Sequence, residues 1–237
     1  MAEVSMEQLQ KMVQKALDYH EIQNVMSKHV LYHSQWKHAE EMEKLFAKKT
    51  PGVSFETDQI GRIEGYDAVY AEYAGTAEEK GQKHLENMIK VFPEIENKPE
   101  NRHIGMQVMH ALTNPIIEIA EDGKTAKGFW VTTGHLTTPK GHKLQAYWFW
   151  ERYGCDFVKE DGEWKIWHLR VFTDFLCPFE KSWAELAMED QTPGPQRVEG
   201  IANAPTTIPY KAYSPYNLPQ CPPVPEPYKT FSETFSY

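Results

Sequence analysis

The sequence predicts an α+β fold in which N-terminal helices pack on a curved antiparallel sheet. Up to Phe92, apolar residues recur at steps of three and four, which is the period of helices. From Arg102 onward the period is two, as in strands, and turn signals such as Glu121-Asp122-Gly123 separate the runs. Because the two patterns are segregated along the chain and do not alternate, we expect hairpin-linked antiparallel strands.

The helical part begins with one long helix. Ser5 followed by Gln8 three residues later is a capping box, which marks the first turn of a helix. The residues that share one face of this helix are Leu9, Met12, Val13, Ala16, Leu17, Ile22, Val25, Met26, His29, Val30 and His33. Further helices are expected over residues 38–47, 65–73 and 77–92, with a strand over residues 53–63. We expect the long helix to fill the curve of the sheet.

The strand part and the end of the chain differ in composition. Strands are expected over residues 104–112, 116–120, 125–137, 143–153 and 164–175. Beyond about residue 191 prolines exclude regular helix and strand, yet aromatic residues recur among them, which disordered segments usually lack. We therefore expect one domain over residues 1–190 and a Pro- and aromatic-rich tail over residues 191–237 that lies on its own domain or on a neighbouring subunit.

The composition excludes several classes of protein. The net charge of −9 comes from 25 Lys and Arg against 34 Asp and Glu, and an acidic surface repels nucleic-acid phosphates. No apolar run approaches the roughly 20 residues of a membrane helix, and the N-terminus lacks the order of a signal peptide, so we expect a cytoplasmic protein. Aromatic residues make up 13% of the chain, which favours an apolar cavity. Cys155, Cys177 and Cys221 are scattered, and we expect buried free thiols.

Two histidines on predicted strands are candidates for chemistry. His110 ends an apolar strand face, and His135 lies on the next long strand, on the face of Phe129 and Val131. Apolar burial disfavours the charged imidazole, so such a histidine is suited to proton transfer near neutral pH. For each, the alternative is a core histidine held by one hydrogen bond. Adjacent antiparallel strands would bring the two imidazoles to one cavity.

No metal and no cofactor is expected. His29 and His33 are four residues apart on one helical face, but the sequence contains no HExxH, and we expect no carboxylate near the pair to complete a zinc site. Glu40-Glu41 is interpreted as part of a solvated helix face, and Asp156 as a solvated turn residue. Neither a GxGxxG nor a Walker A sequence occurs, and a GxSxG nucleophile is also absent.

Three segments carry a resemblance to a known family. They read His110-Ala-Leu-Thr-Asn-Pro-Ile-Ile-Glu-Ile, then Glu121-Asp-Gly-Lys-Thr-Ala, and later Phe157-Val-Lys-Glu-Asp-Gly-Glu-Trp-Lys-Ile. In this order, over residues 9–175, the chain resembles the SnoaL-like group of the NTF2-like superfamily, which includes scytalone dehydratase and the bile-acid 7α-dehydratase. The resemblance implies an NTF2-like cone, with the Pro-rich C-terminal extension outside it.

The resemblance also implies roles for individual residues. His110 matches the histidine before the Asn-Pro step, which is the general base in the dehydratases. His135 matches a second pocket histidine, and Tyr32 matches a tyrosine near the end of the first helix. The aspartate that the family places near this tyrosine is missing between residues 32 and 38. The side chains expected to line the pocket and bind substrate are His33, Trp36, Phe55, Phe129 and Tyr147.

These features predict a cofactor-independent lyase that uses histidine acid–base catalysis. It would eliminate water or formaldehyde from a hydroxylated aromatic or polycyclic substrate. One alternative is a non-catalytic module that binds a small hydrophobic ligand or a partner protein. Another is a ketosteroid-isomerase-like enzyme, which requires a pocket carboxylate that the sequence does not identify. We expect a homo-oligomer, either a dimer or a trimer, paired through the apolar outer face of the sheet, and neither nucleic acid nor a membrane as partner.

Overall fold

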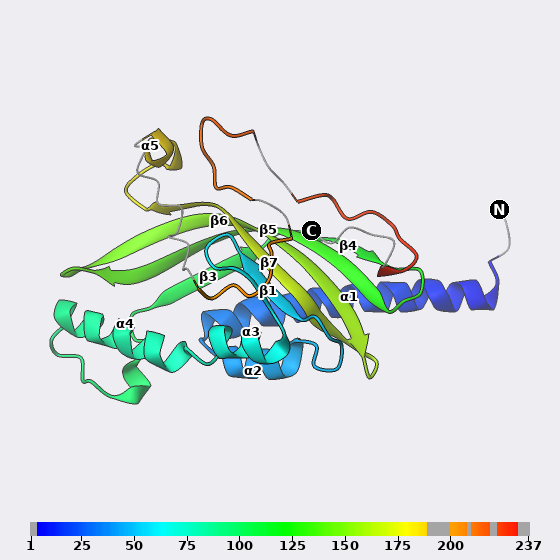
Figure 1. Cartoon of the computed structure of the whole chain (residues 1–237), viewed down its shortest axis with the longest axis horizontal. Helices are drawn as coiled ribbons and strands as arrows, with labels where there is room; N and C mark the ends of the chain where they lie inside the picture. Colours follow the sequence, from blue (N-terminus) through cyan, green and yellow to red (C-terminus); the bar gives the residue numbers. More distant parts are fainter. Residues whose placement is uncertain (1–3, 189–199, 208–209, 219–221, 232–237) are drawn as a thin grey trace.

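The computed structural model describes residues 4–188, 200–207, 210–218 and 222–231. Its elements, in chain order, are α1 (Met6–Ser34), α2 (His38–Leu45), β1 (Ser54–Thr57), β2 (Gly61–Glu64), α3 (Tyr66–Tyr73), α4 (Ala77–Val91), the 3₁₀ helix η1 (Pro99–Asn101), β3 (Gln107–Leu112), β4 (Ile116–Ile119), β5 (Thr125–Lys140), β6 (Lys143–Glu160), β7 (Glu163–Pro178) and α5 (Trp183–Met188). Helices α1 to α4 lie along one side of the sheet, and the C-terminal segment lies along the other (Figure 1). The predicted α+β architecture is confirmed.

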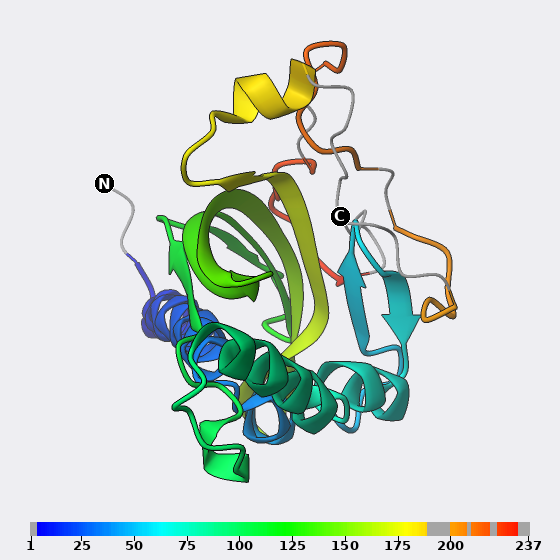
Figure 2. The same ribbon diagram turned by 90° about the vertical axis from the view of Figure 1, so that its left-hand side faces the viewer.

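The sheet is built around three long strands. The strand order is β2-β1-β7-β6-β5-β3, and β4 also pairs with β5. All pairs are antiparallel except β1 with β7. Strands β5, β6 and β7 have 16, 18 and 16 residues, and the sheet that they form is strongly curled (Figure 2). Strands of this length can close partly around the helices, which creates room for a cavity between the sheet and the helices.

The segment predicted as one strand over residues 53–63 is instead the hairpin β1–β2. The Thr57 hydroxyl accepts hydrogen bonds from the backbone N–H groups of Gln59 and Ile60, which closes a turn after β1. Gly61 follows at φ +79°, a conformation that glycine adopts without strain. The hydrophobic pattern did not reveal this turn, because turns are decided by these local polar contacts.

Helix α1 begins as predicted, with the capping box of Ser5 and Gln8 present in both directions. Its C-terminal half buries Ile22 and Met26 completely against the sheet. Its N-terminal half extends beyond the sheet (Figure 1), and there the apolar face is exposed, with Met12 at 63% and Leu17 at 52%. The predicted face is therefore real, but only half of it contributes to the core.

Successive residues of the long strands face opposite sides of the sheet. On β6, Tyr153 and Phe157 face the helices and join the core, whereas Arg152 and Asp156 face the other side. We call the helix-covered side the inner face and the opposite side the outer face. This alternation decides which of the predicted site residues can meet.

The outer face buries a network of charged side chains centred on Asp156. The Asp156 carboxylate contacts Lys127 Nζ at 3.2 Å, Arg170 Nη1 at 3.0 Å and His168 Nδ1 at 2.8 Å. Burial alone raises the pKa of Asp156, but the cations and hydrogen bonds around it outweigh burial and hold that pKa far below its ordinary value. The prediction of a solvated turn residue is thus wrong for Asp156, which is 0% exposed in the middle of β6.

Residues of the C-terminal tail add further contacts to this network on the outer face. The Thr207 backbone N–H and hydroxyl both donate to the Glu56 carboxylate, and Glu56 also lies 3.9 Å from Arg170. Further along, Tyr228 contacts the Thr125 hydroxyl, and the Phe231 ring lies 5.1 Å from Lys127 Nζ. The described tail residues therefore cover part of the outer face that we expected to pair with another subunit.

Cys155 and Cys177 are buried free thiols, as predicted, whereas Cys221 lies outside the described residues. Among the described helices, none combines the length and the apolar character that crossing a membrane requires.

Candidate active site

A cavity of about 340 Å³ lies under the inner face of the sheet, at the corner between α1 and α2. Its lining residues are His29, His33, Trp36, His38, Phe55, Thr57, Gln59, Ile60, Glu72, Tyr73, Ala77, Lys80, His110, Glu151, Tyr153, Leu169, Val171 and Thr173. The volume lies within the range of small-molecule sites, and the lining combines apolar and aromatic walls with a few polar groups.

Four histidines meet at this cavity. His29 and His33 are one helical turn apart on α1, His38 begins α2, and His110 lies on β3. The His33 ring is central, with its centroid 5.0 Å from that of His38 and 4.8 Å from that of His110. Burial, followed by the neighbouring imidazoles of His110, His38 and His29, holds the pKa of His33 well below its ordinary value. His33 is therefore neutral at physiological pH.

The corner between α1 and α2 depends on Trp36. Its φ of +59° is in the left-handed region, which few non-glycine residues adopt. The indole stacks on the His103 ring at 4.9 Å and lines the cavity, which holds the residue in this conformation. The turn reverses the chain so that His33 and His38, from two helices, come to lie side by side.

Glu41 on α2 is the carboxylate at the centre of the cluster. It is fully buried, and its Oε1 lies 2.5 Å from His29 Nδ1. The Tyr73 hydroxyl donates to it at 3.0 Å, and His38 Nδ1 lies 3.5 Å from its Oε2. Burial by itself raises the pKa of Glu41, but His29 and His38 outweigh burial, so the pKa lies below its ordinary value. Glu41 is therefore an anion in the interior.

His110 forms a second polar group with Glu151 and Tyr153. Its Nδ1 lies 3.1 Å from the Glu151 carboxylate and 3.2 Å from the Tyr153 hydroxyl. Because a carboxylate accepts, Nδ1 carries the proton, and Nε2 is left with a free lone pair. That Nε2 is buried and has no hydrogen-bond partner among the described residues. This is the arrangement of a general base that is oriented by a carboxylate.

Gly134 on β5, which pairs with His110, leaves room for the aromatic ring that packs against the imidazole. A Cβ at Gly134 would lie 2.2 Å from the Phe149 ring, so only glycine leaves room for it. Phe149 in turn lies 4.9 Å from the His110 ring and packs against it. The imidazole is thus held by packing as well as by Glu151.

The structure brings four of the eight predicted site residues to this cavity. His110, His33, Trp36 and Phe55 all line it. The other four lie elsewhere in the described chain.

His135 and Phe129 occupy odd positions of β5 and face outward. His110 pairs with Gly134, so the neighbouring His135 faces the side opposite to His110 and is exposed. Tyr147 is on the inner face of β6 but lies beyond Phe149, past the cavity. Tyr32 packs against the core, and its hydroxyl accepts a hydrogen bond from Lys44. The predicted meeting of two strand histidines does not occur, because the strand register separates them.

Sequence reasoning missed Glu41, His29, His38, Tyr73, Glu151 and Tyr153. The interpretation of Glu41 as part of a solvated helix face is wrong, because the corner at Trp36 turns Glu41 inward. The expectation that no carboxylate lies near His29 and His33 is therefore wrong as well. A local signal was present, since His38 and Glu41 are three residues apart and so share one face of α2.

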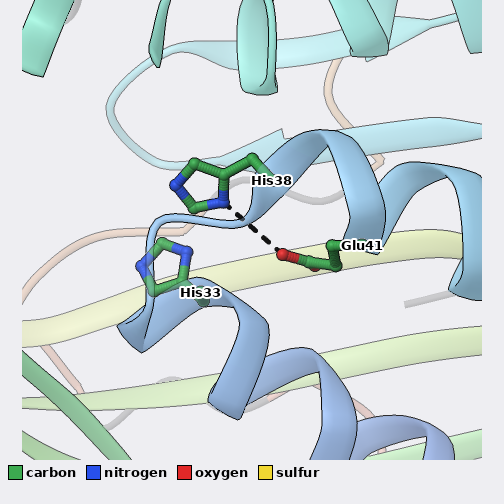
Figure 3. A group of neighbouring side chains, drawn as sticks. All are labelled: His33, His38 and Glu41. Atoms are coloured by element: carbon green, nitrogen blue, oxygen red, sulfur yellow. Dashed lines mark hydrogen bonds and ion pairs between the residues drawn. The ribbon is translucent and has the colours of Figure 1, made fainter. Parts of the chain in front are cut away.

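The side chains of His33, His38 and Glu41 each offer a possible metal-ligand atom, and these atoms all lie within 4.8 Å of one another (Figure 3). Two imidazoles and a carboxylate form a donor set that divalent transition metals use. In the described chain this is the one group of three or more such residues close enough to share an ion.

A second cavity of about 400 Å³ lies on the outer face, between the tail and strands β6 and β7. Its charged core is paired, because Arg152 bonds the Asp174 carboxylate at 2.9 Å and Tyr210 donates to the same carboxylate. The inner cavity contains the oriented but unpartnered imidazole of His110, so we take it as the candidate site.

The fold that surrounds this site, helices packed on a curved antiparallel sheet, is the one that the sequence predicts. Residues 14–170 match the SnoaL-like domain family, and since this is more than half of the chain, the protein belongs to that family. Among curated proteins, none matches the sequence.

Solved structures match the chain at low sequence identity. A hexachlorocyclohexane dehydrochlorinase, LinA type 2, is 13% identical with a TM-score of 0.50, over 72% of this chain and 94% of that one. A candidate scytalone dehydratase of Novosphingobium aromaticivorans is 14% identical with a TM-score of 0.50, over 72% and 93%. An NTF2-like protein with a cystatin-like fold from the same organism is 11% identical with a TM-score of 0.47, over 77% and 96%. At these identities the similarity defines the fold alone.

Proposed function

We propose that the inner cavity is the active site of a lyase that eliminates water from a small hydroxylated aromatic or polycyclic substrate. The observation that carries this proposal is the buried, unpartnered Nε2 of His110, whose ring is fixed through Nδ1 by Glu151. Membership of the SnoaL-like family and the similarity in fold to a dehydrochlorinase and a candidate dehydratase support it.

The chemistry needs one base and one hydrogen-bond donor. His110 Nε2 takes a proton from the carbon next to the carbon that carries the hydroxyl, the electron pair forms the double bond, and the C–O bond breaks. The protonated imidazole, stabilised by Glu151, then returns the proton to the departing hydroxide, which leaves as water. The Tyr153 oxygen accepts from His110 Nδ1, so the Tyr153 proton is free to stabilise the leaving oxygen.

A second candidate is an isomerase, and one observation favours it. Glu151 supplies the pocket carboxylate that the sequence did not identify, and it is only 12% exposed by side chain. An isomerase would move a proton between two carbons and release nothing. The mass of the product therefore separates the two candidates: a lyase product is lighter by one water, whereas an isomerase product keeps the mass of the substrate.

The test is turnover of a panel of hydroxylated aromatic and polycyclic alcohols, followed by mass spectrometry of the products. His110→Gln keeps the side-chain volume but loses the base, so we expect a fall in kcat of at least about 10²-fold. His142→Gln, on the exposed turn between β5 and β6, is the matched control and should retain activity. Full activity of His110→Gln would overturn the mechanism. Binding of panel members without turnover would favour a ligand-binding module.

We further propose that the exposed apolar stripe of α1 is a contact between subunits. Leu9, Met12 and Leu17 lie on one helical face beyond the sheet, and all three are about half exposed or more. Isolated exposed apolar residues are common, but a continuous stripe on a projecting helix is typical of an interface. Light scattering of Met12→Lys/Leu17→Lys against the unchanged protein tests this: a smaller particle is expected, and an unchanged one would contradict it.

A further inference from the structure

We propose that His33, His38 and Glu41 bind one divalent transition-metal ion at the wall of the inner cavity. This inference goes beyond the elimination proposed above and does not depend on it. It rests on the spacing of the three side chains, on the neighbours that orient them, and on the charge of the site.

The spacing of His38 and Glu41 fits two ligands of one ion better than it fits a hydrogen bond. His38 Nδ1 and Glu41 Oε2 are 3.5 Å apart, which is the outer limit for a hydrogen bond. Two ligands of a tetrahedral ion with bonds of about 2.1 Å are about 3.4 Å apart. The ligand atoms of all three residues lie within 4.8 Å, so side-chain movements on the order of 1 Å close the set. Figure 3 shows His33 and His38 on the same side of the Glu41 carboxylate.

The hydrogen bonds of Tyr73 fix the position of the His33 proton. The Tyr73 hydroxyl donates its single proton to Glu41, at 3.0 Å from Oε2. Toward His33 Nδ1, at 3.1 Å, the same oxygen must therefore accept, so Nδ1 carries the imidazole proton. The nitrogen of His33 that lies nearer to Glu41 in Figure 3 is Nδ1, so a metal ion bound there replaces this proton and the hydrogen bond to Tyr73.

His29 and Tyr73 hold the Glu41 carboxylate in a fixed orientation. His29 Nδ1 lies 2.5 Å from Glu41 Oε1, which leaves Oε2 turned toward His38. Carboxylates that bind metals are commonly fixed by such neighbours. Three ligands with this support, next to an open cavity, leave a further coordination position for water or for a substrate oxygen.

The buried negative charge of Glu41 would also be stabilised by a cation. Glu41 is 0% exposed, and among the described residues its ion-pair partners are the histidines His29 and His38 alone. A buried carboxylate is costly unless a positive charge compensates it. A proton on one of these histidines can supply this positive charge, and so can a bound metal ion. Only the metal ion would give saturable binding in a metal titration.

The experiment uses the full chain without a histidine tag, freed of metals by a chelator and titrated with Zn²⁺ by calorimetry. We expect saturable binding of one Zn²⁺ per chain, at least about 10-fold weaker for His38→Ala and for Glu41→Gln. His142→Ala should bind as the unchanged chain does. Circular dichroism checks that each variant is folded, and if Glu41→Gln does not fold, His33→Ala replaces it.

Co²⁺ provides a second readout. It should give visible absorption bands of a four- or five-coordinate site in the unchanged chain, and these bands should be lost in His38→Ala. The absence of saturable Zn²⁺ binding, or equal binding by the ligand variants, would overturn the proposal and leave a proton as the compensating charge of Glu41. Because no substrate is present, failure here is distinct from failure of the elimination.

Discussion

The two faces of the sheet bury polar side chains in opposite ways. On the outer face, Lys127, Asp156 and Arg170 are all at most 2% exposed, and each charge contacts an opposite charge. On the inner face, four histidines line an open cavity, and His110 Nε2 has no partner in the described chain. Both regions are polar and buried, but the charged groups of the outer face are paired, whereas the candidate base of the inner face is not.

This difference separates structure from function. A buried charge network in which each charge already contacts an opposite charge gains little from a ligand, so its role is to hold the tail and the sheet together. Unpaired buried polar atoms cost stability, and they are retained where a ligand recovers that cost. We therefore interpret the outer network as structural and the inner cluster as functional, and three substitutions test that interpretation.

The largest effect is expected from Asp156→Ala. It removes the carboxylate that Lys127 and Arg170 share in the buried outer network, so the free energy of unfolding should fall by about 3–5 kcal/mol. Urea denaturation measures this. The control is Asp161→Asn, at an exposed partner of Lys49, which should cost less than about 1 kcal/mol because asparagine also adopts the positive φ of this turn. Equal costs for the two variants would remove the argument that the outer network is structural.

An intermediate effect, dependent on pH, is expected from Asp58→Asn. Asp58 follows β1 and accepts a hydrogen bond from the Thr173 backbone N–H, but no described residue forms an ion pair with it, and burial raises its pKa to about 6. Between about pH 4 and pH 6 the folded protein keeps this proton while the unfolded chain releases it, so stability is lost as the pH rises through that window.

The asparagine introduced by Asp58→Asn keeps an oxygen that accepts from the Thr173 backbone N–H, but it does not ionise. At pH 8 the variant should be more stable than the parent by about 1–2 kcal/mol, a figure reduced for partial exposure, and at pH 4 the two should be equal. Denaturation curves at the two pH values measure this. A difference that does not change with pH would show that the raised pKa of Asp58 is not its cause. The contrast with Asp156, whose cations lower its pKa, would then lose its support.

The smallest effect on stability is expected from His33→Leu. The imidazole is neutral, and its one hydrogen bond within the cluster goes to Tyr73, which keeps its bond to Glu41. Leucine fills a similar volume, so the free energy of unfolding should change by less than about 1 kcal/mol in either direction. The same variant should bind Zn²⁺ more weakly. A loss of stability comparable to that of Asp156→Ala would instead show that the histidine cluster is structural.

The sequence by itself determined the local features. The capping box of Ser5 and Gln8 placed the start of α1, the alternation of apolar residues placed the long strands, and His110 was identified together with His33, Trp36 and Phe55 of the cavity. These features depend on neighbours within a few residues, and local periodicity records them. The family resemblance, carried by three short segments, is confirmed over residues 14–170.

Only the tertiary structure decided which of these local faces meet. His135 was predicted beside His110, but pairing of His110 with Gly134 turns His135 to the outer face, and a shift of one residue would have reversed this. Glu41 joins His29 because the corner at Trp36 folds α2 back onto α1, and no pattern within either helix encodes that angle. Strand register and the angle between helices are set by long-range packing, and so the inner cavity became visible only in three dimensions.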